Sequence, residues 1–189
     1  MSNAVEKVRD RLLRAAKALD EAGVPYAVVG GNAVAAWVST VDEAAVRTTR
    51  NVDILLRLPD LPRAIEALSG HGFVHRRLAS LGQGMDVFLD GPEARVRDAI
   101  HIIPAGVKTT SDCAGPAPDV AESALAEGFT LISLPALIRM KLTAWRDKDR
   151  MHLRDLASVG LLAIPPGEES LPELLAERLQ FIRDTPEDL

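Results

Sequence analysis

The chain has 189 residues, of which 47% are hydrophobic and 26% charged, and its 22 Lys and Arg against 27 Asp and Glu give a formal net charge of −5. The apolar content excludes a disordered or fibrous protein, and the length suffices for one compact domain with a small helical appendage. The acidic balance argues against a protein that grips nucleic acid over its whole surface, although neighbouring arginines such as Arg95 and Arg97 leave room for a local basic patch.

We expect a cytoplasmic protein without a membrane span. The N-terminal segment interleaves charged and apolar residues and has no uninterrupted signal-peptide core. No apolar run approaches the roughly 20 residues that cross a bilayer. The single cysteine, Cys113, cannot form an internal disulfide, which suits a reducing compartment.

The first elements in chain order are a helix, a strand and a second helix. Apolar residues recur at helical spacing over residues 5–19, and Gly23 stops this helix. A short apolar run over residues 26–29 ends at Gly30 and Gly31, and an alanine-rich stretch follows. This order predicts a strand, a glycine turn and a helix.

Further strand patterns complete a sheet in the first hundred residues. Residues 52–56 form a second apolar run, and a helix is expected between Pro62 and Gly70. Two more apolar runs, at 85–89 and 99–103, flank a turn and are typical of a hairpin. The first hundred residues therefore predict a mixed α/β sheet.

The rest of the chain becomes helical after an irregular connection. Residues 104–128 carry several prolines and small residues, with one short helix expected near 120–126. A strand at 129–133 precedes three expected helices, at 134–145, 148–162 and 171–182. We therefore predict an α+β fold in which a mixed sheet flanked by helices occupies residues 1–133 and a helical subdomain, residues 134–189, packs on it.

The glycine turn is the first feature that points to chemistry. Gly30 and Gly31 open a helix, where backbone N–H groups and the helix dipole can hold a phosphate that a side chain would obstruct. Two glycines after a strand are more often only a tight turn, so this signal is weak alone.

The second feature is a pair of polar residues on the strand over residues 52–56. Asn51 and Asp53 are two residues apart, so their side chains point to one face of the sheet. Paired oxygens suit Mg²⁺, a hard ion that takes carboxylates together with substrate phosphates. The alternative is an ordinary polar strand residue, yet an ionised carboxylate between Val52 and Ile54 is costly to bury without a partner.

The third feature lies on two consecutive predicted helices. Lys141 falls on the first of them, and Asp149 and Asp155 fall on the second. By itself this pattern is typical of a solvated, charge-paired helix surface.

Together, the three features resemble the nucleotidyltransferase superfamily, which has the polymerase-beta-like fold, and in particular its small bacterial branch of AbiEii-type toxins and minimal nucleotidyltransferases. The resemblance covers roughly residues 26–162, with the motifs in the same order. It implies transfer of a nucleoside monophosphate from an NTP to a hydroxyl group of a small molecule, a protein or an RNA. The cofactor it implies is Mg²⁺ or Mn²⁺.

The resemblance also implies roles for individual residues. Gly30 and Gly31 would contact the triphosphate, and Asp53, with Asn51 beside it, would hold the metal ion. The matching polar positions around the nucleotide are Arg47, Thr49, Lys141 and Asp155. Phosphoryl transfer relies mainly on positioning and charge neutralisation, so Arg47 and Lys141 are sensible partners for phosphate oxygens.

The chain departs from the family pattern at the metal site. Asn51 stands where the family's Asp-x-Asp strand has its first aspartate, so one negative charge is missing. A third carboxylate usually comes from a later strand, where this chain has His101; Asp86, on the preceding strand, is the other candidate. Histidine is a poor ligand for Mg²⁺ but a suitable general base, although His101 is at least as well explained as a histidine satisfied by the backbone.

The sequence therefore supports two functions. One is a nucleotidyltransferase with an altered, one-metal site, whose acceptor is a molecule such as tRNA. The other is an inactive module of the same fold that binds a nucleotide or a partner, for instance the cognate antitoxin protein of a two-gene system. RNA binding through the arginine patches ranks lower, because the net charge is −5 and aromatic residues are scarce.

Overall fold

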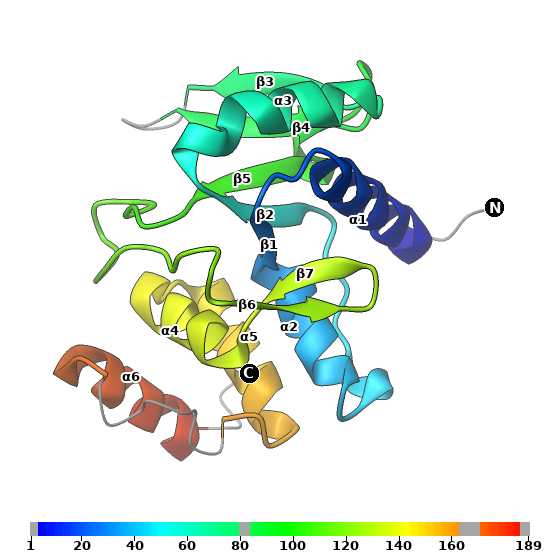
Figure 1. Cartoon of the computed structure of the whole chain (residues 1–189). Helices are drawn as coiled ribbons and strands as arrows, with labels where there is room; N and C mark the ends of the chain where they lie inside the picture. Colours follow the sequence, from blue (N-terminus) through cyan, green and yellow to red (C-terminus); the bar gives the residue numbers. More distant parts are fainter. Residues whose placement is uncertain (1–3, 80–83, 163–170, 186–189) are drawn as a thin grey trace.

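The computed structural model describes residues 4–79, 84–162 and 171–185, and it confirms an α+β fold (Figure 1). Seven strands form one mixed sheet in the order β3-β4-β5-β2-β1-β7-β6. The strands are β1 (Tyr26–Val29), β2 (Val52–Leu56), β3 (Val74–Leu78), β4 (Met85–Leu89), β5 (Ile100–Pro104), β6 (Ser123–Ala126) and β7 (Phe129–Ile132). The helices are α1 (Ala4–Glu21), α2 (Gly30–Ser39), α3 (Leu61–Gly70), α4 (Leu134–Ala144), α5 (Asp147–Ser158) and α6 (Glu173–Asp184).

The register of three central strands places the polar residues of interest side by side. β2 pairs antiparallel with β1 and parallel with β5. In this register Asp53 lies between Val29 of β1 and His101 of β5. Because side chains of directly paired residues point to the same face, these three residues share one face of the sheet.

Each face of the sheet has its own apolar core. One core contains Leu19 of α1, Ile54 of β2 and Leu68 of α3, so α1 and α3 cover that face. The other core joins α2 to α4, α5 and α6, with Leu137 and Leu153 fully buried. Figure 1 shows α4, α5 and α6 gathered in its lower part, away from α1 and α3. None of the helices in the described part of the chain is both long and apolar enough to cross a membrane.

Local sequence explains the turn between α4 and α5. Ser133 caps α4, where its hydroxyl accepts a hydrogen bond from the backbone N–H of Ala136. The helix ends at Trp145, whose φ of 52° is left-handed, and α5 begins directly afterwards, where the Asp149 carboxylate accepts a hydrogen bond from the backbone N–H of the N-cap residue Arg146. This sharp turn presses α4 against α5.

The short helix expected near residues 120–126 is wrong, because Ser123–Ala126 is strand β6. β6 pairs antiparallel with β7 in a hairpin whose turn contains Gly128 at a φ of 86°. The hydrogen bonds to β7 outweigh the weak helical preference of the alanines, since such a preference is easily overridden by tertiary pairing.

Candidate functional site

The glycine turn lies directly against Asp53. Gly30 has a φ of 67°, and a Cβ added there would lie 2.0 Å from Asp53 Oδ2. A Cβ on Gly31 would lie 3.1 Å from the Cβ of Thr49. Val29, the N-cap residue of α2, gives no side-chain hydrogen bond to the first turn of the helix. The start of α2 is thus a turn that only glycine fits, with backbone donors that no capping side chain occupies.

Asp53 is held in a small polar cluster. The Asn51 side-chain amide donates to Asp53 Oδ1 at 2.7 Å and lies 3.3 Å from His101 Nδ1. His101 Nε2 donates to the Val96 carbonyl at 3.2 Å, and Nδ1 lies 3.5 Å from Asp53 Oδ1. The hydrogen bond to Asp53 raises the pKa of His101, against the opposing effect of burial. The structure thus brings Asn51, Asp53 and His101 together beside Gly30.

This donor set fits one divalent ion rather than two. Asp53 is the sole carboxylate of the cluster, and in the described ranges no group of three or more His, Cys, Asp and Glu residues could hold a metal. Mg²⁺ is commonly held by one or two carboxylates together with substrate phosphates. Asp53 and the amide oxygen of Asn51, which now accepts from the Thr49 hydroxyl, could meet one ion that arrives with a nucleotide.

The expectation that Asp86 shares this ion is wrong. On β4 it is Val87, not Asp86, that lies beside His101, so Asp86 points to the opposite face of the sheet. There it lies 2.8 Å from His75 Nε2 and 2.8 Å from Arg77 Nη1. Its partners are residues of β3, and it plays no part in the Asp53 cluster.

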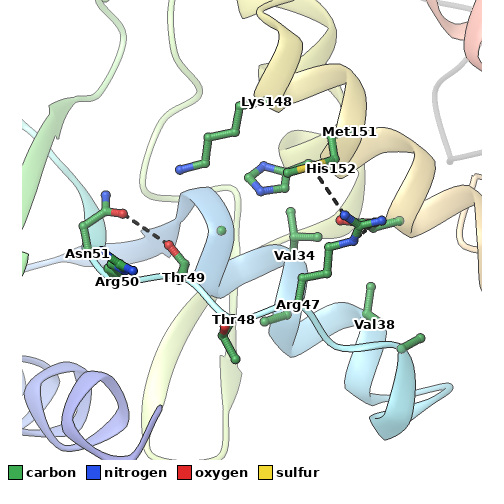
Figure 2. Close-up of a pocket in the computed structure, with 14 residues that line it drawn as sticks. Val34, Val38, Arg47, Thr48, Thr49, Arg50, Asn51, Lys148, Met151 and His152 are labelled. Atoms are coloured by element: carbon green, nitrogen blue, oxygen red, sulfur yellow. Dashed lines mark hydrogen bonds and ion pairs between the residues drawn. The ribbon is translucent and has the colours of Figure 1, made fainter. Parts of the chain in front are cut away.

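A cavity of about 460 Å³ opens beside the glycine turn, between α2, the segment before β2, and α5 (Figure 2). It is lined by Gly31, Val34, Ala35, Val38, Ala45, Arg47, Thr48, Thr49, Arg50, Asn51, Lys148, Met151, His152 and Asp155. Three lining residues are cationic and one is a carboxylate. Figure 2 shows the Lys148 ammonium directed towards Asn51 and Thr49. The cavity therefore offers a cationic environment next to Asp53, which suits a phosphate group.

Sequence reasoning missed Lys148 and His152 as site residues. They are four residues apart on α5, so both project from the same side of the helix into the cavity. This spacing is visible in the sequence, but nothing in it shows which side of the helix meets α2. Arg50 also lines the cavity.

Lys141 does not line this cavity, contrary to the expectation that it contacts phosphate. Its side chain is 6% exposed, and Nζ lies 3.0 Å from Asp149 Oδ1. Arg146 Nε lies 2.7 Å from the other carboxylate oxygen of Asp149. Burial lowers the pKa of Lys141, although the Asp149 carboxylate opposes the shift. Lys141 thus belongs to a buried ion pair that fixes α4 to α5.

Arg47 and Asp155 meet as an ion pair at the cavity wall. Arg47 Nε lies 2.8 Å from Asp155 Oδ1, and the Arg47 side chain is 52% exposed. Burial raises the pKa of Asp155, and Arg47 partly counteracts this. Two buried atoms, Asp155 Oδ2 and His152 Nδ1, have no hydrogen-bond partner within the described part of the structure. Buried polar atoms without partners are rare in folded proteins.

His152 should make stability depend on pH. Burial, with Lys141 and Lys148 nearby, lowers its pKa to about 3, from 6.5 for an ordinary histidine. The unfolded chain therefore binds a proton at His152 between these two pH values while the folded chain does not, and stability falls as the pH drops through this window. We expect wild type to lose more free energy of unfolding than His152→Gln between pH 7 and pH 4 in urea titrations. Parallel losses in the two proteins would contradict a neutral, buried His152.

The fold of this chain is similar to the folds of known proteins. No protein-family model and no curated protein matches the chain. An antigenic nucleotidyltransferase-like protein from Paracoccidioides brasiliensis has a similar solved structure, with a TM-score of 0.57 and 16% identity, covering 96% of this chain and 90% of that one. The fold is nucleotidyltransferase-like.

Two further solved structures are similar. JHP933 from Helicobacter pylori has a TM-score of 0.55 and 19% identity, covering all of this chain and 78% of that one. The antibiotic-resistance factor ANT(2'')-Ia has a TM-score of 0.51 and 16% identity, covering 94% of this chain and 90% of that one. At such identities the likeness establishes the arrangement of the chain, and function has to be argued from the site.

Proposed function

We propose that this protein binds a nucleoside triphosphate in the cavity between α2 and α5 and transfers its nucleoside monophosphate to an acceptor hydroxyl group, with release of pyrophosphate. The observation that carries the proposal is the contact between the Gly30 turn and Asp53, beside a cavity with a cationic lining. A glycine turn at a helix start accommodates phosphate, and a carboxylate next to it accommodates the accompanying ion.

In this mechanism the protein mainly positions and neutralises the phosphates. Backbone N–H groups at the start of α2, the Thr49 hydroxyl and the Lys148 ammonium would bind phosphate oxygens. Asp53 and Asn51 would hold Mg²⁺ or Mn²⁺, which supplies neutralisation of the charge that develops on the phosphate. His101, whose Nε2 is engaged by Val96, would accept the proton of the acceptor hydroxyl at Nδ1.

The second candidate function is a module that binds a nucleotide or partner without transferring anything. The composition of the Asp53 cluster favours it, because an amide and an imidazole stand where the family pattern has carboxylates. With one carboxylate, the site attracts a divalent ion less strongly than a site with two.

The order of motifs over residues 26–162 supports a place in the small bacterial branch that includes the AbiEii-type toxins. Within the proposal the protein is cytoplasmic. Its acceptor is an RNA such as tRNA, a small molecule or a protein, and an antitoxin protein would be the partner of the inactive form. Transfer from a radiolabelled NTP to one of these acceptors distinguishes the enzyme from the inactive module.

Calorimetric titration with ATP and MgCl₂ or MnCl₂ tests the proposed site. We expect metal-dependent binding in wild type and its loss in Asp53→Ala, because that change removes the sole carboxylate of the cluster. Asn51→Asp should raise the affinity for Mg²⁺ by roughly tenfold, since it restores a second charged oxygen ligand.

The control for these variants is Asp147→Asn, because Asp147 lies on α5 with a side chain that is 95% exposed. It should bind ATP like wild type. Absence of nucleotide binding in wild type would overturn the proposal. An unchanged or weaker Mg²⁺ affinity in Asn51→Asp would show that Asn51 does not face the ion.

A further inference from the structure

Two buried polar atoms of α5, for which the described part of the chain supplies no hydrogen-bond partner, lie further along the helix than Lys148. Asp155 follows Lys148 by seven residues, which corresponds to about 10 Å along the helix. Asp155 and His152 are 8% and 6% exposed, and Asp155 Oδ2 and His152 Nδ1 lack hydrogen-bond partners among the described residues. If phosphates occupy the end near Lys148, the base of the same nucleotide reaches the end near Asp155.

We infer that Asp155 and His152 select the nucleobase, and that they favour a base whose Watson–Crick edge places an exocyclic amino group next to an unprotonated ring nitrogen, namely adenine or cytosine. This inference rests on the proposed function. Val34, Val38 and Met151 line the same cavity and supply apolar surface for a flat ring. The base would pack on these side chains and present its polar edge to α5.

The chemistry of Asp155 explains the preference for an amino group. Its Oδ1 is engaged by Arg47, so Oδ2 is the atom left to accept a hydrogen bond. Oδ2 is recessed from solvent. An amino group projects beyond the ring and can reach such an atom. The ring N–H of uracil or hypoxanthine lies beside a carbonyl oxygen, which a carboxylate repels.

His152 complements this contact. As a neutral imidazole it can carry a hydrogen on Nδ1 and donate it to the ring nitrogen beside the amino group. Arg47 now covers this end of the cavity, with Nη1 3.6 Å from the Met151 sulfur. Its side chain is half-exposed and extends from a loop, so the guanidinium can shift away from the Met151 sulfur to admit a base while Nε keeps its ion pair with Asp155 Oδ1. A bound base would thus satisfy both partnerless atoms.

Calorimetric titrations of wild type with two nucleotide pairs test the inference. ATP is compared with ITP, and CTP with UTP, each in the same MgCl₂ buffer, because each pair differs by an amino group replaced with a carbonyl. We expect the amino member to bind about tenfold more tightly in at least one pair, as is typical of a hydrogen bond to a charged group.

Asp155→Asn should bring this ratio close to one or reverse it, since an asparagine can turn its amide N–H towards a carbonyl. Asp147→Asn, the same chemical change on the exposed side of α5, should keep the wild-type ratio. The ratio of two dissociation constants from one preparation does not depend on the fraction of folded protein. The comparison therefore survives a loss of stability, and the wild-type ratios test the inference without any variant.

Each outcome separates the inference from the proposed function. Equal affinities within both pairs, or tighter binding of ITP and UTP, would overturn the selection of an amino group while leaving nucleotide binding intact. An unchanged ratio in Asp155→Asn would overturn the role of Asp155. If wild type bound none of the four nucleotides, the proposed function would fail and the inference with it.

Discussion

Replacing Gly30 with alanine is expected to lower the free energy of unfolding by about 2–4 kcal/mol and to abolish nucleotide binding. The left-handed φ of 67° is strained for any residue with a side chain, and the new Cβ would lie 2.0 Å from Asp53 Oδ2. Either the turn or the carboxylate must then move, and both belong to the proposed phosphate and metal site. Urea unfolding and calorimetric titration with ATP measure the two effects.

Two other glycines separate the strain from the contact. Gly72 has a φ of 84° but open space around its Cβ position, so Gly72→Ala should cost only about 1–2 kcal/mol. Gly31→Ala meets Thr49 at 3.1 Å without a left-handed φ and should be milder than Gly30→Ala. In an Asp53→Ala background the penalty at Gly30 should shrink, because the nearest atom is gone. Equal costs for Gly30→Ala and Gly72→Ala would mean that the contact with Asp53 is unimportant.

Local patterns were sufficient to predict the centre of the site. The apolar run before Gly30 predicts a strand followed by a turn, and the two-residue spacing of Asn51 and Asp53 predicts that their side chains share a face. The hydrogen bond between these side chains agrees with that spacing. Both predictions depend on residues close together in the chain, where periodicity carries the information.

Features set by pairing between distant segments could not be predicted. The face of Asp86 depends on the register of β4 against β5, and a shift of one residue would have turned it towards Asp53. The side of α5 that lines the cavity depends on how α5 packs against α2, so Lys148 and His152 were overlooked. Residues 123–126 likewise form strand β6 where a helix is expected from the sequence, because they pair with the edge of β7.

The role of Lys141, a buried charge, could not be predicted from the sequence either. The sequence shows a lysine on a helix before a second helix that carries three aspartates, which fits a phosphate ligand and a structural ion pair equally well. The left-handed Trp145 turns the chain so that Asp149 meets Lys141 instead of solvent. The choice between the two roles therefore follows from the geometry of a single turn.

The largest loss of stability is expected for Asp149→Asn, at about 3–5 kcal/mol. Asp149 is 1% exposed and accepts from Lys141 Nζ, from Arg146 Nε and from the Arg146 backbone N–H. Burial favours protonation of this carboxyl, but Arg146 and Lys141 outweigh it and hold its pKa below the usual value. The asparagine would leave the Lys141 ammonium buried without the carboxylate that it contacts, which is the costly way to break such a pair.

Lys141→Met should cost much less, within about 1.5 kcal/mol, because Asp149 keeps its hydrogen bonds to Arg146 and methionine fills the apolar space. Asp147→Asn should change the free energy of unfolding by no more than about 0.5 kcal/mol, as expected of an exposed position. Urea unfolding of the three variants checks this order, and a cost for Asp149→Asn no larger than that for Asp147→Asn would contradict a buried pair.

The affinity for ATP distinguishes the structural lysine from the lysine of the cavity. Lys141→Met should bind ATP like wild type. Lys148→Met should bind it about tenfold more weakly, since Lys148 lines the cavity.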